Sequence, residues 1–307
     1  MTAHLLPPGI EVFERGWLSA NNIFHYGKDD VSLVDSGYCA HQKMTLDLVS
    51  GALKKHGSST LNKLVNTHLH SDHCGGNAAL AEAFHCEVYI PAAEEAAVKN
   101  WDSTLLSYDN LGQECPQFSH HHVLIPGEEI QLGRYLWKIL AAPGHDPHSI
   151  MLYQADHRIL ISADALWEEG FGVIFPELWG EAGFEEVAQT LDLIETLPID
   201  LVIPGHGAPF ADVSKSLATA RSRLDYLASD PDRNARHGAK VLLKYRLLEW
   251  RSREIQQVND WIANTPALIS AAKLLNMSMD EFTQWLPRSL VKSGAAKLEG
   301  ETLVDLA

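Results

Sequence analysis

Short apolar runs alternate with amphipathic stretches over residues 10–206, and Gly, Pro, Asn or Asp interrupts each junction. Short β-branched or aliphatic runs between turn residues predict strands, and apolar positions three and four apart predict helices. The predicted strands cover residues 31–34, 63–66, 87–90, 123–125, 137–141, 150–153, 159–162 and 201–203. The predicted helices lie at about residues 41–56, 76–84, 91–101 and 184–196. This alternation is typical of an α/β layered fold.

The pattern changes after about residue 212, where residues 213–229 and 235–263 predict long helices with apolar spacing. Two further helices are expected at residues 266–275 and 279–293. Glu299-Gly300 predicts a tight turn between two short strands within residues 296–306. The order of these elements is similar to that of a winged helix-turn-helix. We therefore expect two domains, at residues 1–212 and 213–307.

The composition fits a folded cytoplasmic protein: 46% of the 307 residues are hydrophobic and 21% are charged. No apolar run approaches the roughly 20 residues of a membrane helix, and residues 1–15 lack the pattern of a secretory signal. The four cysteines have no two-residue spacing, so neither a zinc ribbon nor a small disulfide framework is expected.

The net charge of −16 disfavours binding to phosphate backbones or anionic lipids. Residues 234–307 hold 10 Lys and Arg against 8 Asp and Glu, which leaves −18 on residues 1–233. In the helix at 279–293, Asp280 and Glu281 offset Arg288 and Lys292, whereas a DNA-reading helix presents a basic face. We expect a small-molecule substrate rather than nucleic acid or a membrane, and a C-terminal domain that packs against the first or forms a homodimer.

Ligand-type side chains are concentrated where the strand at 63–66 runs through a turn into a helix. His68 and His70 are two residues apart, so in an extended chain they share a face and can converge on one ion. Asp72 and His73 follow after the chain turns and can serve a neighbouring ion. The spacing predicts two metal ions.

Other predicted strands also end at a ligand-type residue. His145 follows the strand at 137–141, Asp164 the strand at 159–162, and His206 the strand at 201–203. Asp35 stands at the end of the strand at 31–34. One edge of the fold is therefore expected to be lined with His and Asp.

Together these segments resemble the successive motifs of the metallo-β-lactamase superfamily, in the same order, over roughly residues 10–210. The resemblance implies a four-layer αββα sandwich, which the predicted C-terminal helical, winged-helix-like domain follows. The combination of His206-Gly207 with that domain is similar to the branch with lactamase-like protein 2, a nuclease, and the quinolone-signal thioesterases. It implies that two divalent ions bind, with zinc expected and manganese or iron as alternatives. The implied ligands are His68, His70 and His145 for one ion, Asp72, His73 and His206 for the other, and Asp164 between them. Asp35 would hold a ligand histidine in orientation.

Such a site predicts hydrolysis, because two divalent ions lower the pKa of a shared water toward about 7. We expect a metal-bridged hydroxide to cleave an ester, thioester or lactone, with Asp72 assisting proton transfer. The alternatives are a phosphodiesterase or endoribonuclease, a mono-iron persulfide dioxygenase that uses His68, His145 and Asp164, and a non-catalytic effector.

The segment after Asp164 is rich in Gly and in large aromatic side chains. Trp167, Phe171, Phe175 and Trp179 predict an apolar substrate pocket, and packing between the two domains is the alternative. His148 is a further candidate for substrate contact, against an ordinary hydrogen-bonded loop histidine.

Overall fold

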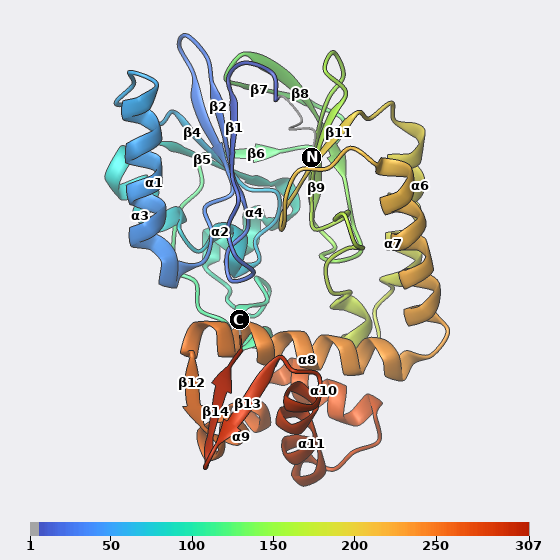
Figure 1. The fold of residues 1–307 in the computed structure, drawn as a ribbon. Helices are drawn as coiled ribbons and strands as arrows, with labels where there is room; N and C mark the ends of the chain where they lie inside the picture. Colours follow the sequence, from blue (N-terminus) through green and yellow to red (C-terminus); the bar gives the residue numbers. More distant parts are fainter. Residues whose placement is uncertain (1–5, 307) are drawn as a thin grey trace.

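The computed structural model describes residues 6–306, which form two packed β-sheets with a helical unit at one end (Figure 1). In the first sheet, antiparallel strands lead into parallel ones, in the order β1-β2-β3-β4-β5-β6. In the second sheet, of order β11-β10-β9-β8-β7, only the β10–β11 pair is parallel. The strands are β1 (Ile10–Phe13), β2 (Asn22–Tyr26), β3 (Val31–Val34), β4 (Lys63–Val65), β5 (Glu87–Pro91), β6 (His122–Leu124), β7 (Glu129–Leu132), β8 (Tyr135–Ala141), β9 (Ile150–Gln154), β10 (Ile159–Ala163) and β11 (Leu201–Pro204).

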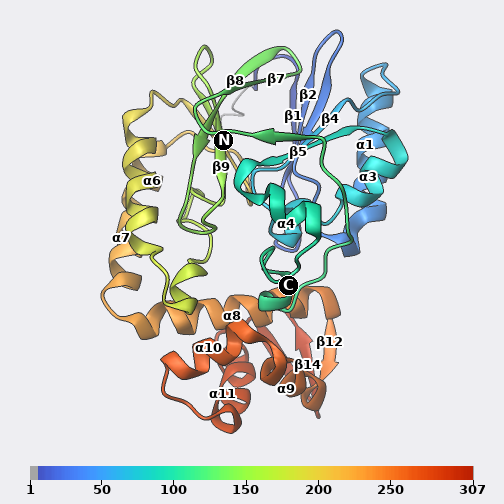
Figure 2. The same ribbon diagram turned by 180° about the vertical axis from the view of Figure 1, so that it is seen from behind.

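Helices cover the outer faces of both sheets, which gives the four layers (Figures 1 and 2). The first sheet is covered from α1 and α3, where Val49 and Leu80 are fully buried against β3 and β4. The second is covered from α6 and α7, where Leu191 and Ala220 are fully buried against β10 and β11. The helices of this part are α1 (Gln42–Lys55), α2 (Ser71–Cys74), α3 (Asn77–Phe84), α4 (Glu95–Asn100), α5 (Tyr108–Leu111), α6 (Phe184–Thr196) and α7 (Val213–Ala228). The predicted α/β sandwich is confirmed.

A third apolar cluster fills the space between the sheets. It joins Val34 and Val65 of the first sheet to Trp137, Leu152 and Ile203 of the second. These side chains come from alternating strand positions, so their neighbours face the outer helices. The packing holds the two sheets face to face and brings the ends of β3, β4, β10 and β11 together at one edge.

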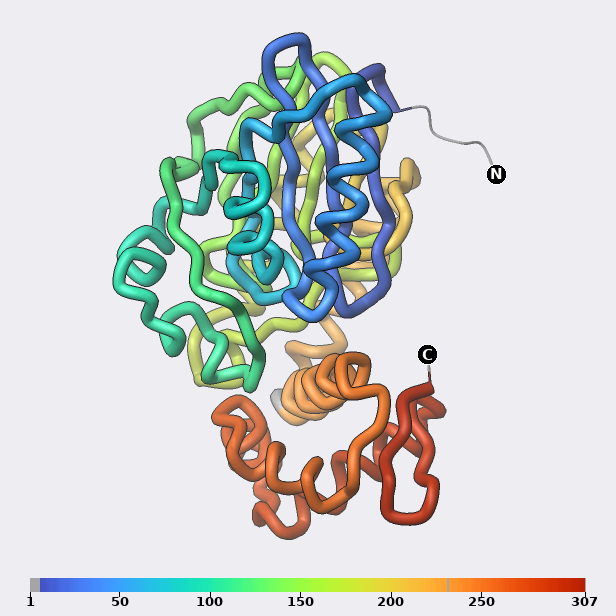
Figure 3. Tube along the Cα trace, turned by 90° about the vertical axis from the view of Figure 1, so that its left-hand side faces the viewer, coloured from blue at the N-terminus to red at the C-terminus, as the bar shows by residue number. Residues whose placement is uncertain are grey.

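The remaining elements form the helical unit, which lies across one end of the sandwich (Figure 3). Its elements are α8 (Pro231–Trp250), β12 (Ser252–Glu254), α9 (Ile255–Asn264), α10 (Pro266–Leu274), α11 (Met279–Lys292), β13 (Ala296–Glu299) and β14 (Thr302–Asp305). The three strands pair antiparallel in the order β12-β14-β13. The core of this unit includes residues from α8 to β14, such as Leu243, Leu268, Phe282 and Leu303. No helix among residues 6–306 is both long enough and apolar enough to cross a membrane.

The boundary between the core of the sandwich and the core of the helical unit lies after α7 rather than before it. Leu217 and Leu224 of α7 pack with α6 and the second sheet, whereas Leu242 of α8 belongs to the core of the helical unit. The domain boundary at residue 212 stays a prediction. It assigns α7 to the second domain, whereas α7 packs with the core of the sandwich.

The predicted element bounds hold at many places, and the strand at 31–34 and the helix at 184–196 have the predicted ends. The continuous helix expected over 235–263 is wrong. It ends at Trp250, Arg251 has a φ of +63°, and β12 then pairs with β14 before α9 begins. Strands β1, β2 and β7 were not predicted, because one or two polar residues interrupt each of these short segments and leave no continuous apolar run.

Candidate metal centre and its pocket

The turn after β4 carries the densest group of candidate ligands. His68 and His70 lie on the loop that leaves β4, and α2 follows at once with Asp72 and His73. The chain after α2 must pass very close to its neighbours, since a Cβ at Gly75 would lie 2.6 Å from the backbone nitrogen of Cys39. Glycine at this position therefore allows the turn that brings both pairs to the same edge of the sandwich.

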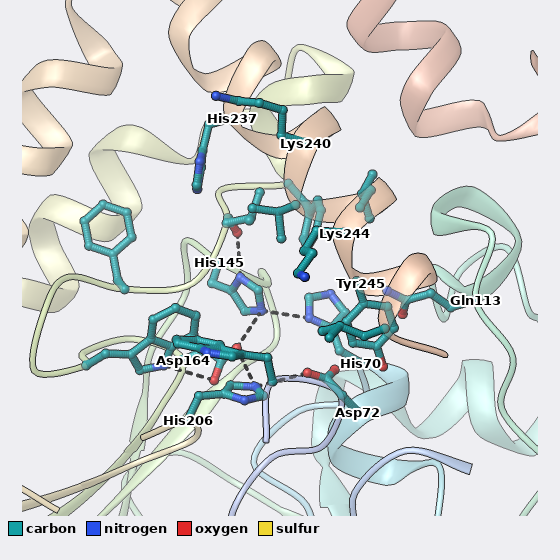
Figure 4. Close-up of a pocket in the computed structure, with 18 of the residues that line it drawn as sticks. His70, Asp72, Gln113, His145, Asp164, His206, His237, Lys240, Lys244 and Tyr245 are labelled. Carbon is teal, nitrogen blue, oxygen red and sulfur yellow. Dashed lines mark hydrogen bonds and ion pairs between the residues drawn. The ribbon is translucent and has the colours of Figure 1, made fainter. Parts of the chain in front are cut away.

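The first group of candidate ligands joins His68 and His70 with His145, from the loop after β8. Their ligand atoms lie within 4.8 Å of one another, and His70 Nδ1 lies 2.8 Å from His145 Nε2 (Figure 4). All three side chains are buried. The loops after β4 and β8 therefore direct three imidazole nitrogens to one point.

The second group consists of Asp72, His73 and His206, which follows β11. His206 Nε2 lies 3.1 Å from Asp72 Oδ2, and His73 Nε2 lies 4.0 Å from the same oxygen. Asp164, at the end of β10, stands between the two groups: its Oδ2 is 3.4 Å from His145 Nε2, and its Oδ1 is 3.3 Å from His73 Nε2. Oδ2 also lies 4.0 Å from His206 Nε2, so Asp164 contacts members of both groups.

The donor set fits divalent metal ions. Buried ring nitrogens normally have a hydrogen-bond partner, yet Nε2 of His68 and Nε2 of His73 have none among the described residues. Burial lowers the pKa of His70 and of His145 to about 4, which keeps these rings in the neutral form that binds metals. Burial opposes the charge on Asp164, but the neighbouring His73 holds its pKa well below the usual range. His73 differs from these two rings: burial opposes its charge, but Asp164 and Asp35 raise its pKa well above the usual value. Imidazole nitrogens and carboxylate oxygens are the ligands that zinc binds in hydrolytic sites.

Carboxylates behind the candidate ligands fix the ring orientations. Asp35 Oδ2 lies 2.8 Å from His73 Nδ1, and Asp35 also accepts hydrogen bonds from the backbone N–H and the hydroxyl of Thr67. Asp146 Oδ2 lies 3.6 Å from His70 Nε2, on the side of the ring opposite to His145. Such contacts select the tautomer and increase the basicity of a ligand histidine.

Residues 15–206 match the family described as the metallo-beta-lactamase superfamily, which spans more than half of the chain. The chain belongs to this superfamily. It is 31% identical over 204 residues to a probable metallo-hydrolase, YqgX, of Bacillus subtilis, an alignment that covers 64% of this chain and 89% of that protein. It is 24% identical over 242 residues to a hydroxyacylglutathione hydrolase of Brucella ovis, with 79% of this chain and 75% of that protein covered.

Solved structures share the fold of this superfamily member. A metallo-beta-lactamase family protein from Thermus thermophilus superposes with a TM-score of 0.57 at 19% identity, over 98% of this chain and 100% of that one. The BLEG-1 B3 metallo-beta-lactamase gives a TM-score of 0.55 at 22% identity, over 68% of this chain and 96% of that one. The first superposition extends over both the sandwich and the helical unit, so the whole architecture recurs in a solved protein.

A cavity of about 480 Å³ opens above the two ligand groups of this metallo-β-lactamase fold. The sandwich supplies its floor and one wall, and α8 supplies the opposite wall (Figure 4). The wall from the sandwich includes three of the predicted pocket residues, Trp167, Phe171 and Phe175. The volume lies within the range of small-molecule sites.

Two of the predicted pocket residues lie elsewhere. Trp179 packs against the core of the helical unit and is not among the residues that line the cavity, so the packing alternative holds for this side chain. His148 also lies outside the cavity lining: its Nδ1 is 2.8 Å from Glu94 Oε1, and its backbone N–H donates to Asp146. The contact with Glu94 therefore holds the His148 ring away from the cavity, next to Asp146, which contacts His70.

Several lining residues were not predicted from the sequence. Trp17 is 62% exposed and stacks on His206 with ring centroids 5.5 Å apart. Arg223, Lys240 and Tyr245 come from α7 and α8. Trp17 stands alone in a turn after Gly16, and the helical residues fit an ordinary amphipathic pattern, so no local signal marks them as part of a site.

Proposed function

We propose that this protein is a metal-dependent hydrolase that cleaves an ester or thioester bond in a small substrate with an apolar part. The observation that carries the proposal is the buried His and Asp cluster at the floor of a cavity whose other walls are mainly apolar. Similarity to proteins named hydroxyacylglutathione hydrolase supports the choice of a thioester among the hydrolysable bonds. The membership of a particular branch of the superfamily stays a prediction.

Two divalent ions, with zinc as the proposed metal and manganese or iron as alternatives, would be held by the two ligand groups with Asp164 between them. When bound, such ions supply an activated water and polarise the oxygen of the scissile carbonyl. His68, His70 and His145 would hold one ion, and Asp72, His73 and His206 the other.

The chain itself contributes orientation, proton handling and a dry cavity. Asp72 is the more exposed of the two carboxylates that line the cavity: its side chain keeps 14% exposure while Asp164 keeps 5%. We assign to Asp72 the movement of a proton toward the leaving group. Burial raises the pKa of the Tyr245 phenol well above its usual value, so this lining residue keeps its proton and can donate a hydrogen bond to the substrate.

The helical unit supplies the second wall, because α8 carries Lys240, Val241, Leu242, Lys244 and Tyr245 into the cavity lining. We propose that residues 213–307, with their winged-helix-like order of elements, cover the site rather than bind nucleic acid. A homodimer through this unit is a further proposal, and the mass in solution tests it.

The test is hydrolysis by zinc-loaded protein of a panel of thioesters, carboxylic esters, lactones, phosphodiesters and short RNA. Asp72→Ala is the diagnostic variant. Asp225→Ala is the matched control, because Asp225 lies on an exposed turn of α7 and forms no ion pair within residues 6–306. Turnover of a thioester or ester that Asp72→Ala abolishes and Asp225→Ala preserves is the expected result. Cleavage confined to phosphodiesters or RNA overturns the acyl assignment, and oxygen uptake on a persulfide by iron-loaded protein overturns hydrolysis itself.

A further inference from the structure

The end of the cavity away from the candidate metal centre is lined by basic side chains. Arg223 comes from α7, and His237 and Lys240 from α8. Figure 4 shows His237 and Lys240 on the α8 side of the cavity, opposite Asp72, Asp164 and His206. A substrate that spans the cavity would therefore have one end at the metal centre and the other at these basic side chains.

The described part of the chain offers no counter-charge to Arg223 or Lys240. Among residues 6–306, no carboxylate lies within ion-pair distance of either side chain. Arg223 Nη2 donates to His237 Nε2 at 2.7 Å. Burial, followed by the charge of Arg223, lowers the pKa of His237 to about 4, so this ring is neutral and accepts the hydrogen bond. The contact leaves the charge of the guanidinium intact.

A neighbouring lysine shows the contrast. Lys244 also lines the cavity, but its Nζ contacts the carboxylate of Asp305 and donates to the carbonyl oxygens of Ala295 and Leu306. Its charge is thus satisfied inside the helical unit. Unpaired cations beside an apolar cavity are costly, so the absence of a partner at Arg223 and Lys240 calls for an anion from outside the chain.

The cavity between the two ends is apolar. Phe171, Phe175, Leu242, Leu248 and Leu290 line it. The guanidinium carbon of Arg223 lies 5.3 Å from the ring centroid of Phe171, which orients the group along this wall. The lining therefore runs from metal ligands, through apolar side chains, to two free cations.

We propose that Arg223 and Lys240 bind an anionic group of the substrate, which is an ester or thioester with an apolar body and a carboxylate or phosphate at the end remote from the scissile bond. This inference rests on the proposed hydrolase function and names the substrate class for the same site. The net charge of −16 repels anions from most of the surface. Two unpaired cations inside the cavity make it the place where an anionic substrate is attracted.

The test uses thioesters of N-acetylcysteamine, whose thiol part is neutral, with acyl chains of graded length that end in a methyl group, a carboxylate or a phosphate. For the zinc-loaded wild-type protein we expect kcat/KM to be about 10-fold or more higher for an anionic chain than for the methyl-ended chain of equal length, equivalent to about 1.4 kcal/mol. The carboxylate and phosphate series identify which anion the site takes.

The diagnostic variants are Arg223→Gln and Lys240→Met, and Lys273→Met is the charge-matched control. Lys273 is exposed near the end of α10 and lies outside the cavity lining. We expect each diagnostic variant to reduce the anionic-to-methyl ratio of kcat/KM by about 5- to 10-fold, mainly through KM, as a lost charged hydrogen bond does. Lys273→Met should keep the wild-type ratio. Lys240 is only half-buried, so its variant keeps the test valid if Arg223→Gln does not fold.

A binding measurement separates this inference from the proposed function. The probes are the corresponding thioethers, in which a methylene replaces the carbonyl so that no hydrolysis occurs, and calorimetry gives their Kd. Tighter binding of the anionic thioether that Arg223→Gln and Lys240→Met weaken supports the inference even if no thioester is hydrolysed. Hydrolysis without preference for an anionic chain, or a preference that survives both substitutions, overturns the inference and leaves the hydrolase assignment standing.

Discussion

Asp35 Oδ2 lies 2.8 Å from His73 Nδ1, so a carboxylate outside the ligand groups holds the ring whose other nitrogen faces Asp164. The backbone of Asp35 has a φ of +58°, a left-handed conformation that Asn also adopts readily. Thr67 donates two hydrogen bonds to the same carboxylate, from its backbone N–H and its hydroxyl. The position is therefore built to present a charge to His73.

Asp35→Asn should weaken metal binding without unfolding the protein. The amide has nearly the shape of the carboxylate and tolerates the backbone, but it removes the charge that orients His73, and such changes typically cost 10–100-fold in metal affinity. Zinc affinity measured by competition with a chelator checks this, with the exposed Asp225→Asn as control. Wild-type affinity in Asp35→Asn would show that Asp35 does not position the ligand.

Gly205→Ala should damage the centre through crowding alone. A Cβ at Gly205 would overlap Asp164 Oδ1 and lie 3.0 Å from His73 Cε1, so both side chains must shift. We expect metal affinity and hydrolysis to fall by at least about 10-fold, since a displacement near 1 Å disrupts such sites. The metal content of the variant and of the wild type, measured after dialysis, provides the readout.

The matched control for that substitution is Gly51→Ala. Gly51 lies in α1, and apart from its chain neighbours and the backbone of its own helix no atom of residues 6–306 lies within 4 Å of the position that its Cβ would take. Alanine in a helix is about 0.8–1.0 kcal/mol more favourable than glycine. We expect Gly51→Ala to raise the thermal stability slightly and to leave the metal content unchanged. Loss of metal in both variants would show that crowding at Gly205 is not the cause.

Trp17→Ala should affect substrate binding more than stability. Trp17 is 62% exposed, stacks on His206, and contacts Trp167 edge-on with centroids 5.4 Å apart. An exposed aromatic side chain at the cavity mouth contributes about 0.5–1.5 kcal/mol of contact beyond its area, which corresponds to a KM increase of up to about 10-fold. Steady-state kinetics on the best substrate of the panel test this.

Met44→Ala is the control for Trp17, because Met44 is 52% exposed and lies on α1, outside the cavity lining. It should change neither KM nor the unfolding temperature noticeably. An unchanged KM in Trp17→Ala would place Trp17 outside the substrate path.

His25→Leu should make the protein less sensitive to acid. His25 is fully buried on β2, both ring nitrogens lack hydrogen-bond partners among the described residues, and burial lowers its pKa from 6.5 to about 3. The unfolded chain therefore binds a proton that the folded chain refuses, and the free energy of unfolding falls as the pH drops from about 6.5 toward 3. At pH 5 this amounts to about 2 kcal/mol, from 1.36 kcal/mol per pKa unit.

Urea unfolding at pH 7.5 and pH 5.0 measures the effect, with zinc held constant. The loss of unfolding free energy between the two pH values should be about 2 kcal/mol smaller in His25→Leu than in the wild type. His157→Gln, at an exposed turn, is the control and should lose as much as the wild type. Equal losses in all three proteins would contradict a neutral, buried His25.

The sequence alone determined the α/β class and the grouping of the candidate ligands, because both follow from local patterns. Strands have a period of two and helices of 3.6, and His68 to His73 lie so close along the chain that a single turn must bring them together. His145, Asp164 and His206 each follow an apolar strand, and the sheet carries these strand ends to one edge.

Only the tertiary structure decided what surrounds that group. The expected helix over 235–263 breaks at Arg251 because β12 finds a partner in β14, more than forty residues further along the chain. Trp179 packs against the core of the helical unit, which comes from a distant part of the chain, and does not line the cavity. In the sequence, Arg223 and Lys240 fit an ordinary helical pattern. The packing of α7 and α8 beside the sandwich places them in the cavity, with no carboxylate of residues 6–306 within ion-pair distance. The metal ligands can be recognised from residues that are close together in sequence. The pocket depends on contacts between segments far apart in sequence, and no local pattern predicts those contacts.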